Sequence, residues 1–194
     1  MSPSPARIPP LEPPYTEAIA SMLRAMMPAG SPIEPLKLFR VFAQHPPMAH
    51  AMHTLGGFVL GGKDRALGTR DREIVIDRVC GRCGCEYEWG VHAVAFGPRV
   101  GLEPPQLAAT AVGAADDAAW SARDRLLIRL VDELHDTASV SDALWEALRA
   151  NWSVPELLEL LLVAGWYHAI SYVANGARVA LEDWGARFPE AAPR

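Results

Sequence analysis

The sequence predicts an all-α protein. Apolar residues recur at helical spacing along most of the chain, and capping residues precede several of these stretches. No segment alternates apolar and polar residues as a half-buried strand would. With 194 residues, of which 50% are hydrophobic, the chain is long enough to bury a substantial core.

Charge and composition exclude several classes of protein. The net charge of -5 and the pI near 5.7 argue against a nucleic-acid-binding protein, which is usually basic. The start of the chain is rich in proline and has no apolar core, so we expect no signal peptide. The most apolar stretch, residues 157–173, contains Glu159 and His168, which favours a buried core helix over a membrane span. Three clustered cysteines without a secretory signal indicate a cytoplasmic protein.

We expect one helical domain over residues 16–185, with a flexible N-terminal arm over 1–15 and a C-terminal tail over 186–194. A weak internal seam lies near 115–121. On either side of it, an early glutamate (Glu73; Glu156 or Glu159) is followed by an aromatic-rich stretch, a pattern that suggests an old duplication.

In the first half of the chain, the helices are predicted from apolar residues at helical spacing and from the proline and glycine residues that end them. Residues 16–27 form an apolar face and stop before Pro28, and the helix predicted from Pro47 ends at Gly61-Gly62. Thr69 is the expected N-cap of a helix that is interrupted near Gly81 and Gly84. The predicted ranges are 16–27, 34–44, 47–60, 70–80 and 85–96.

In the second half of the chain, N-cap residues mark the starts of the predicted helices more clearly than in the first half. Ser121 and Ser141 each precede an amphipathic stretch, and the run Ser153-Val-Pro155-Glu156 is a capping box with proline in the first turn. We also expect a turn or helix before the seam and a last short helix near the C-terminus. The predicted ranges are 104–112, 121–134, 141–150, a long apolar helix from 153, and 174–183.

Reactive side chains concentrate in one run that holds all three cysteines. If a helix begins at Cys85, then Cys85, Glu88 and His92 stand at i, i+3 and i+7 and share one face. The thiol would lie in the first turn, where free amides and the helix dipole favour a thiolate. His92 would accept its proton directly or through water, and Glu73 would orient the histidine or relay the proton. The charges of Glu86 and Glu88 would oppose this activation.

Other residues of the run have alternative roles. Cys80 and Cys83 are either resolving thiols for Cys85 or buried side chains. Tyr87 and Trp89 belong to the core or to a pocket wall, and His53 would reach the site if its helix packs there. Cys80, Cys83, Cys85 and His92 could hold zinc, but their spacing is unusual for such a site, so we expect no metal and no cofactor.

The spacing Glu73-x11-Cys85-x2-Glu88-x3-His92 resembles the carboxymuconolactone decarboxylase family, and within it the alkyl hydroperoxidase D-like (AhpD-like) branch. The resemblance extends more loosely over most of residues 30–185. It implies an all-helical, oligomeric fold with a thiol site near a subunit interface. In that branch two motif cysteines reduce peroxide while the Glu and His relay protons. Here Glu88 stands at the peroxidatic position, so the two-cysteine cycle cannot run.

The resemblance leaves three functions open. The first is a thiol-dependent antioxidant oxidoreductase with peroxiredoxin-type activity, in which Cys85 reacts with a hydroperoxide. The second is a decarboxylase-type lyase that uses Glu73, Glu88 and His92 as acid and base on a lactone-like acid. In the second case Arg72 or Arg78 would clamp the substrate carboxylate. The third is a helical oligomer that binds a ligand or senses redox state. In each case we expect a homo-oligomer, with a dimer favoured over a trimer or hexamer.

Overall fold

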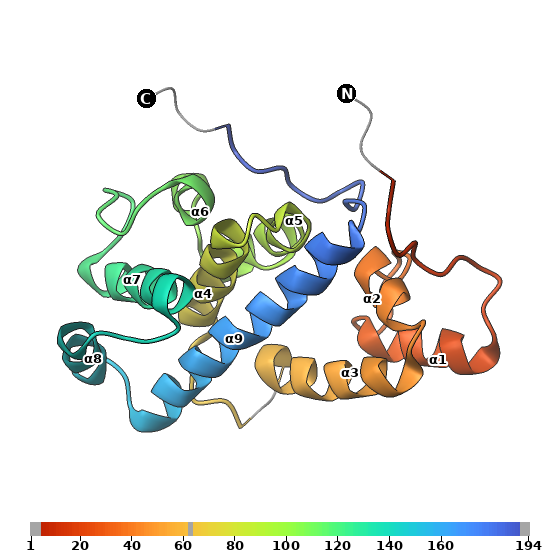
Figure 1. The fold of residues 1–194 in the computed structure, drawn as a ribbon, viewed down its shortest axis with the longest axis horizontal. Coiled ribbons are helices and arrows are strands. Elements are labelled where there is room, and N and C mark those ends of the chain that lie inside the picture. The colour runs from red at the N-terminus through yellow and green to blue at the C-terminus, as the bar shows by residue number, and fades with distance from the viewer. Residues whose placement is uncertain (1–4, 62–63, 191–194) are drawn as a thin grey trace.

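The computed structural model describes residues 5–61 and 64–190, and that part is helical with no strand (Figure 1). The predicted all-α class is therefore confirmed. In chain order the elements are α1 (Glu17–Met26), α2 (Lys37–Phe42), α3 (Pro46–Gly61), α4 (Thr69–Arg82), α5 (Glu86–Ala95), the 3-10 turn η1 (Gly97–Val100), α6 (Pro104–Val112), α7 (Ala122–Thr137), α8 (Asp142–Arg149) and α9 (Val154–Ala177).

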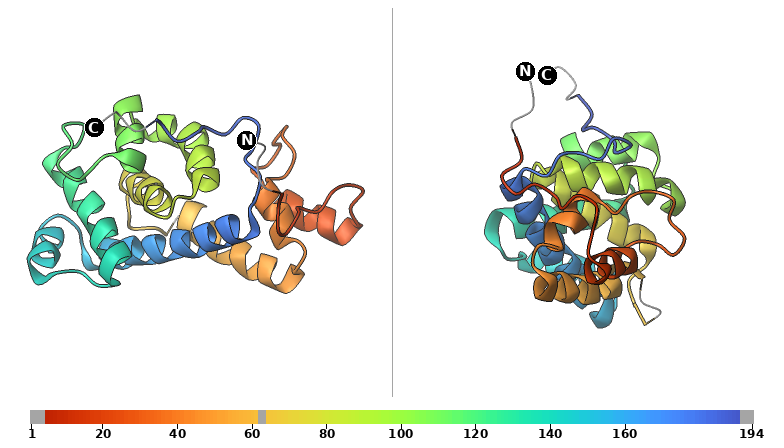
Figure 2. Two further views of the ribbon diagram at one scale, coloured as in Figure 1. Left: turned by 45° about the horizontal axis from the view of Figure 1, so that its top comes forward. Right: turned by 90° about the vertical axis from the view of Figure 1, so that its right-hand side faces the viewer.

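Helix α4 lies at the centre of the molecule, with α5, α6, α7 and α9 packed around it (Figure 2, left). All of residues 71–80 on this helix are consequently buried, including its charged side chains. Several of those charges are paired. Arg78 forms a bidentate pair with Asp132 of α7 and also donates to the Thr110 and Gly113 carbonyls. Such pairing is what allows a helix with so many polar residues to occupy the centre.

Helix α9 is the longest element and runs across the molecule beside α4 and α5 (Figure 1). By length and composition alone it would fit a membrane span, with a hydropathy of 1.4 over an 18-residue window. Its packing against α4 and α5 accounts for the apolar residues on one face, because that face must match the core. Its start is the predicted capping box, with Glu156 accepting from the Ser153 backbone amide at 2.7 Å.

The N-terminal helices α1, α2 and α3 form a separate group at one end of the molecule (Figure 1). The segment before them makes hydrogen bonds with the body from Arg7 onward. The Arg7 amide donates to the Ala177 carbonyl at the end of α9, and Arg40 of α2 pairs with Glu12 at 2.7 Å. The chain after α9 folds back over α5 in a similar way, with the Ala186 amide donating to the Gly90 carbonyl.

Most predicted helices are present, but the prediction of a separate last helix over 174–183 is wrong. Helix α9 continues without a break to Ala177 and ends at Arg178, which adopts a left-handed conformation with φ 54°. Asn175 does not interrupt the helix because its side-chain amide donates to the Cys83 carbonyl of the neighbouring element at 2.9 Å. The residues that follow form turns and extended chain.

Most helix starts differ from prediction by one residue, and that of α2 differs by three. Helix α2 begins only at Lys37, since Pro35 keeps the preceding chain extended and Leu36 is the N-cap. Gly68, not Thr69, is the N-cap of α4. Cys85 is the N-cap of α5 and not its first helical residue. Helix α3 ends at Gly61 as expected, while Gly62 lies outside the described residues.

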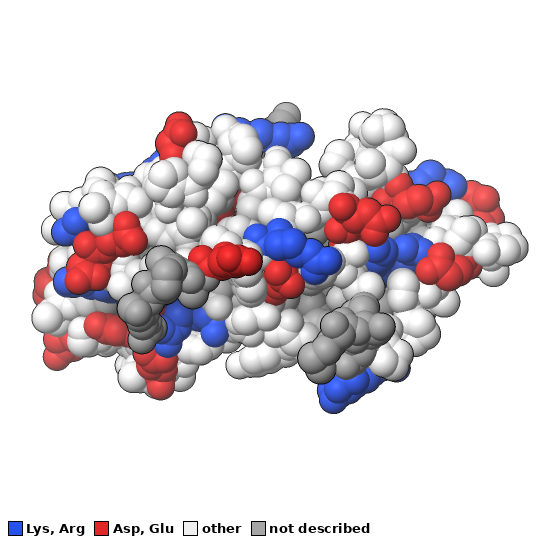
Figure 3. Space-filling model, turned by 90° about the horizontal axis from the view of Figure 1, so that it is seen from above, with Lys and Arg blue, Asp and Glu red and all other residues white. Residues whose placement is uncertain are grey.

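The face shown in Figure 3 carries acidic and basic side chains interspersed over a largely uncharged surface. No extended patch of one sign is visible on that face. This mixture matches the modest net charge of -5.

Candidate active site

Three helices each contribute a pair of polar residues to one buried cluster. Each pair is spaced i, i+4, which places both side chains on the same face of their helix. All six residues are at most 9% exposed. The pairs are Glu73 and Asp77 on α4, Glu88 and His92 on α5, and Tyr167 and Ser171 on α9.

The ring of His92 connects these helices. Its Nδ1 lies 2.7 Å from Glu73 Oε1, and its Nε2 lies 3.1 Å from the Tyr167 hydroxyl and 3.5 Å from Glu88 Oε1. Phe96 stacks on the ring with centroids 4.7 Å apart, which fixes its plane. The predicted constellation of Glu73, Glu88 and His92 is therefore assembled, and Tyr167 joins it.

A cation on His92 is favoured by its surroundings. Burial alone would favour the neutral ring, but the charges of Glu73 and Glu88 and their hydrogen bonds outweigh it and raise the pKa of His92 well above its usual value. Glu73 is fully buried, whereas the Glu88 side chain is 12% exposed. The three groups thus form a chain of proton carriers that leads from the interior towards the surface at Glu88.

Cys85 lies at the start of α5 because of the turn before it. Gly84 adopts a left-handed conformation with φ 59°, the Gly84 amide donates to the Gly81 carbonyl, and the Cys85 amide donates to the Cys80 carbonyl. This is a Schellman motif, which ends α4 and needs glycine at the left-handed position. The motif leaves Cys85 as the N-cap of the next helix, close to the predicted position.

The environment of Cys85 does not favour a thiolate in the resting protein. Its side chain is completely buried, and burial raises the pKa of the Cys85 thiol to about 11. The Glu88 amide and the Ser171 hydroxyl lower the pKa, but the Glu88 charge raises it again. Among the described residues, no hydrogen bond joins Cys85 to His92 directly. Transfer of the thiol proton to His92, directly or through water, stays a prediction.

The other two cysteines differ from each other. Cys80 is fully buried, and burial raises the pKa of its thiol well above the usual value. Cys83 is partly exposed at the C-cap of α4. All three thiols are free. The four residues first considered for zinc do not group together, since no three of Cys80, Cys83, Cys85 and His92 have ligand atoms within 4.8 Å of one another.

The aromatic residues predicted to line a pocket are held in the core. The Tyr87 hydroxyl donates to Glu182 at 2.6 Å and accepts from the Leu38 amide, and the Trp89 indole donates to Thr110. His53 lies half-buried on α3 and makes no hydrogen bond with Cys85 or His92. The two arginines proposed as carboxylate clamps are also engaged elsewhere, Arg72 with the Leu60 carbonyl and Arg78 with α7.

Three residues of the cluster were missed by the sequence reasoning. Asp77 is fully buried with neither carboxylate oxygen hydrogen-bonded, and its burial raises its pKa well above the usual value. A signal was available, because Asp77 follows Glu73 by four residues on an otherwise apolar helix face. Tyr167 and Ser171 had the same i, i+4 signal on the most apolar helix of the chain.

Comparisons with known proteins agree with this architecture. The sequence model of the carboxymuconolactone decarboxylase family matches residues 46–131, which span α3 to the middle of α7. That match confirms the resemblance drawn from the motif. No curated protein is significantly similar to the chain in sequence.

Solved structures show the same fold, two of them over more than nine-tenths of the chain. An uncharacterized peroxidase-related protein from Silicibacter sp. superposes with a TM-score of 0.77 at 16% identity, covering 97% of each chain. An uncharacterized peroxidase-related protein with an alkylhydroperoxidase AhpD core, from Ralstonia eutropha, gives 0.75 at 18% identity, covering 91% of this chain and 93% of the other. A protein of unknown function from Agrobacterium tumefaciens, with a suggested role in antioxidant defence, gives 0.64 at 21% identity, covering 72% and 93%.

Proposed function

Residues 46–131 belong to the carboxymuconolactone decarboxylase family, and from this premise we propose that the chain is a thiol-dependent oxidoreductase of the AhpD type. Its substrate would be a hydroperoxide and its reactive group Cys85. The observation that carries the proposal is the continuous contact of Glu73, His92 and Glu88 beside Cys85, at 2.7 and 3.5 Å. A cysteine that is protonated at rest needs such a path to lose its proton.

The proposed cycle begins with transfer of the Cys85 proton to the Glu88 carboxylate. The thiolate then attacks one peroxide oxygen, so that an S–O bond forms as the O–O bond breaks. The departing alkoxide takes a proton from the relay and leaves as the alcohol, and Cys85 remains as a sulfenic acid. Because Cys85 is completely buried, the start of α5 must open before a peroxide can reach it.

Reduction of the sulfenic acid requires a second thiol. Cys83, which is partly exposed and two residues away, is one candidate, and Cys80 is another. An external small-molecule thiol is the third. In each case condensation of the thiol with the sulfenic acid releases water and forms a disulfide, and further thiol then restores Cys85. Intact mass after treatment with one equivalent of peroxide separates a disulfide from a sulfenic acid.

The test is peroxide consumption in the presence of excess dithiol. We expect Cys85→Ser to abolish turnover and Glu88→Gln to slow it by about 10²–10⁴-fold, the usual contribution of a general base. Cys80→Ser is the control for a buried cysteine outside the family motif, and it should keep its turnover because the excess dithiol replaces any resolving role of Cys80. Equal rates in the wild type and Cys85→Ser would remove the peroxidase proposal.

A lyase that acts by acid–base chemistry is the second candidate. The Tyr167 hydroxyl at 3.1 Å from His92 favours it, because it adds a proton donor to the two carboxylates. The engagement of Arg72 and Arg78 elsewhere counts against it, since the lactone carboxylate then lacks its expected clamp. Carbon dioxide release from a lactone carboxylate would identify this activity if it survives Cys85→Ser and is lost in Glu73→Gln.

We place the protein in the cytoplasm, where its three free thiols would stay reduced. We also propose that it works as a homo-oligomer, with a dimer as the favoured state. Apolar side chains that remain exposed on α9 support self-association.

A further inference from the structure

A second cluster of metal-ligating side chains lies outside the Glu73–His92 site. It consists of Cys83 at the C-cap of α4, His135 in the last turn of α7 and His168 in the middle of α9. One sulfur or nitrogen atom from each residue lies within 4.8 Å of the other two. The three groups come from three separate helices, so the cluster depends on the packing of those helices. It does not follow from the spacing of residues along one helix.

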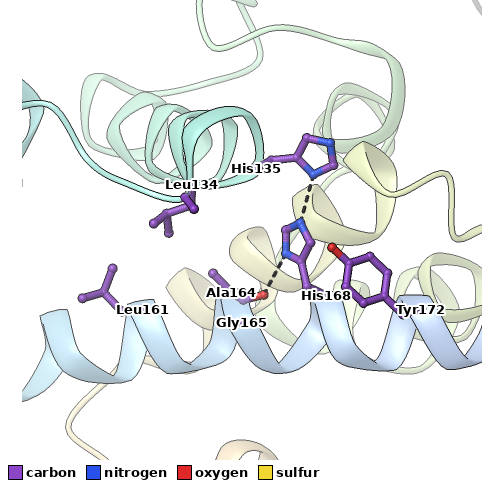
Figure 4. Close-up of a pocket in the computed structure, with 8 residues that line it drawn as sticks. Leu134, His135, Leu161, Ala164, Gly165, His168 and Tyr172 are labelled. Atoms are coloured by element: carbon purple, nitrogen blue, oxygen red, sulfur yellow. Dashed lines mark hydrogen bonds between the residues drawn. The ribbon is translucent and has the colours of Figure 1, made fainter.

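One of the two imidazoles, His168, is oriented as metal-binding histidines usually are. His168 Nδ1 lies 3.1 Å from the Ala164 carbonyl, and His168 Nε2 lies 3.0 Å from His135 Nδ1 (Figure 4). A carbonyl can only accept, so His168 carries its proton on Nδ1 and presents the Nε2 lone pair to the cluster. A backbone carbonyl that accepts from the second ring nitrogen is the common support of a ligating histidine.

The spacing also fits a tetrahedral ion. Two nitrogens bound to zinc at 2.0–2.1 Å with a tetrahedral angle would stand about 3.3 Å apart. The 3.0 Å between His135 Nδ1 and His168 Nε2 is close to that value, so the two imidazoles would need little movement. A thiolate and two imidazoles are ligands that zinc and similar divalent transition metals prefer over magnesium or calcium.

A pocket opens beside the cluster. It has a volume of about 380 Å³ and is lined by both histidines together with Leu134, Leu161 and Tyr172 (Figure 4). Three protein ligands leave one position of a tetrahedral ion for water or a small molecule. The pocket gives that fourth position room and access to solvent, which a closed structural site would lack.

We propose that Cys83, His135 and His168 bind a divalent transition-metal ion of the zinc class through one thiolate and two imidazoles, with the fourth position facing this pocket. This site does not depend on the peroxidase proposal, but a metal-bound Cys83 is not available as the resolving thiol, which leaves Cys80 or an external thiol for that step. The same three groups without a metal would form a thiol beside a hydrogen-bonded histidine pair, and the experiment below distinguishes the two.

The full-length chain, stripped with a chelator, is titrated with Co²⁺ and separately with Zn²⁺. We expect one ion per chain, a cobalt–thiolate charge-transfer band, visible bands of tetrahedral cobalt, and a higher melting temperature with Zn²⁺. Cys83→Ser should lose the charge-transfer band. His135→Gln and His168→Gln should each weaken binding by about 100-fold or more, because even second-shell partners contribute 10–100-fold.

Matched controls separate this site from the other cysteines and histidines. Cys85→Ser and His50→Gln should bind Co²⁺ as the wild type does, and circular dichroism checks that every variant is folded. Absence of saturable binding in the wild type would overturn the proposal. So would a charge-transfer band that persists in the folded Cys83→Ser variant. Because the readout is spectroscopic, neither result depends on peroxide turnover.

Discussion

At the scale of single residues, burial of the Asp77 carboxyl group costs free energy that no hydrogen bond offsets. Both carboxylate oxygens are buried without a hydrogen bond, and burial followed by the charge of Glu73 raises the pKa of Asp77 well above the usual value. The folded state therefore holds a proton that the unfolded chain releases above about pH 4. The free energy of unfolding therefore falls by about 1.4 kcal/mol per pH unit between about pH 4 and the pKa of Asp77 in the folded state.

We accordingly predict that Asp77→Leu raises the melting temperature, and that the gain is larger at pH 8 than at pH 5. Thermal unfolding followed by circular dichroism at both pH values measures this. Val75→Leu on the same buried helix is a control for altered packing, and its effect should not depend on pH. A gain that is equal at both pH values would show that Asp77 is not held protonated.

His92 should add to the same pH dependence. Its pKa in the folded protein is raised, mainly because Glu73 and then Glu88 overcome the opposing effect of burial. The stabilisation is complete below the unfolded pKa of about 6.5 and is lost as the pH rises through the folded value. We predict that His92→Gln flattens the decline of melting temperature between pH 6 and pH 9. An unchanged slope would contradict the charged state assigned to His92.

The residues that sequence spacing could find are those of a single motif. Glu73, Cys85, Glu88 and His92 lie within 20 positions, and helical periodicity places the last two on one face. Tyr167 comes from a helix 75 positions further on, and only the packing of α9 on α4 and α5 brings its hydroxyl to His92. The burial that holds Cys85 as a thiol is also a tertiary property.

At the scale of elements, α5 is held between α9 and the chain that follows α9. Gly90 lies in the middle of α5, and a Cβ there would approach the Ala186 carbonyl oxygen to 2.2 Å. That contact is with backbone, so it cannot be relieved by a side-chain rotation. We predict that Gly90→Ala destabilises the protein by about 1–3 kcal/mol, the usual range for overpacking, and releases residues 186–190 from α5.

Gly176 in α9 is the matched control, because a Cβ there meets nothing within 4 Å. Gly176→Ala should stabilise the protein by about 0.5–1 kcal/mol through the better helix propensity of alanine. Denaturant unfolding measures both variants, and limited proteolysis near residue 187 detects the released segment. If Gly90→Ala and Gly176→Ala have the same effect, the close contact between α5 and the C-terminal segment is not present in solution.

Helix caps explain why most elements were predictable. Ser121, Ser141 and Ser153 each precede a helix in the structure as expected. The separate helix predicted over 174–183 was wrong because local sequence does not show long-range contacts. The hydrogen bond from Asn175 to the Cys83 carbonyl joins residues 92 positions apart. A breaker residue is tolerated where the tertiary structure satisfies its side chain, and the local sequence does not report that.

At the scale of the whole molecule, the first half of α9 presents an apolar stripe to solvent. Val154, Leu158 and Leu162 follow one another at i, i+4 and i+8 and are 68%, 63% and 38% exposed. A pocket of about 310 Å³ adjoins the stripe and is lined by Val154 and Leu158 together with Trp145, Arg149 and Leu157. A contiguous apolar surface with an adjacent pocket is typical of a protein–protein interface.

We therefore predict that the chain forms a homo-oligomer, in the first instance a dimer, through this stripe. Sedimentation equilibrium should give a mass that rises with concentration towards twice 21.1 kDa or a higher multiple. Leu158→Glu places a charge in the centre of the stripe and should raise the dissociation constant by at least about tenfold, as for an unpaired charge buried at an interface. Val112→Glu, at an exposed apolar position on α6, should leave the mass unchanged.

A wild-type monomer at all concentrations, or an oligomer unaffected by Leu158→Glu, would mean that the stripe is not the interface. If Leu158→Glu gives a folded monomer that retains peroxide turnover, each protomer holds a complete site, which agrees with a cluster built from α4, α5 and α9 of one chain.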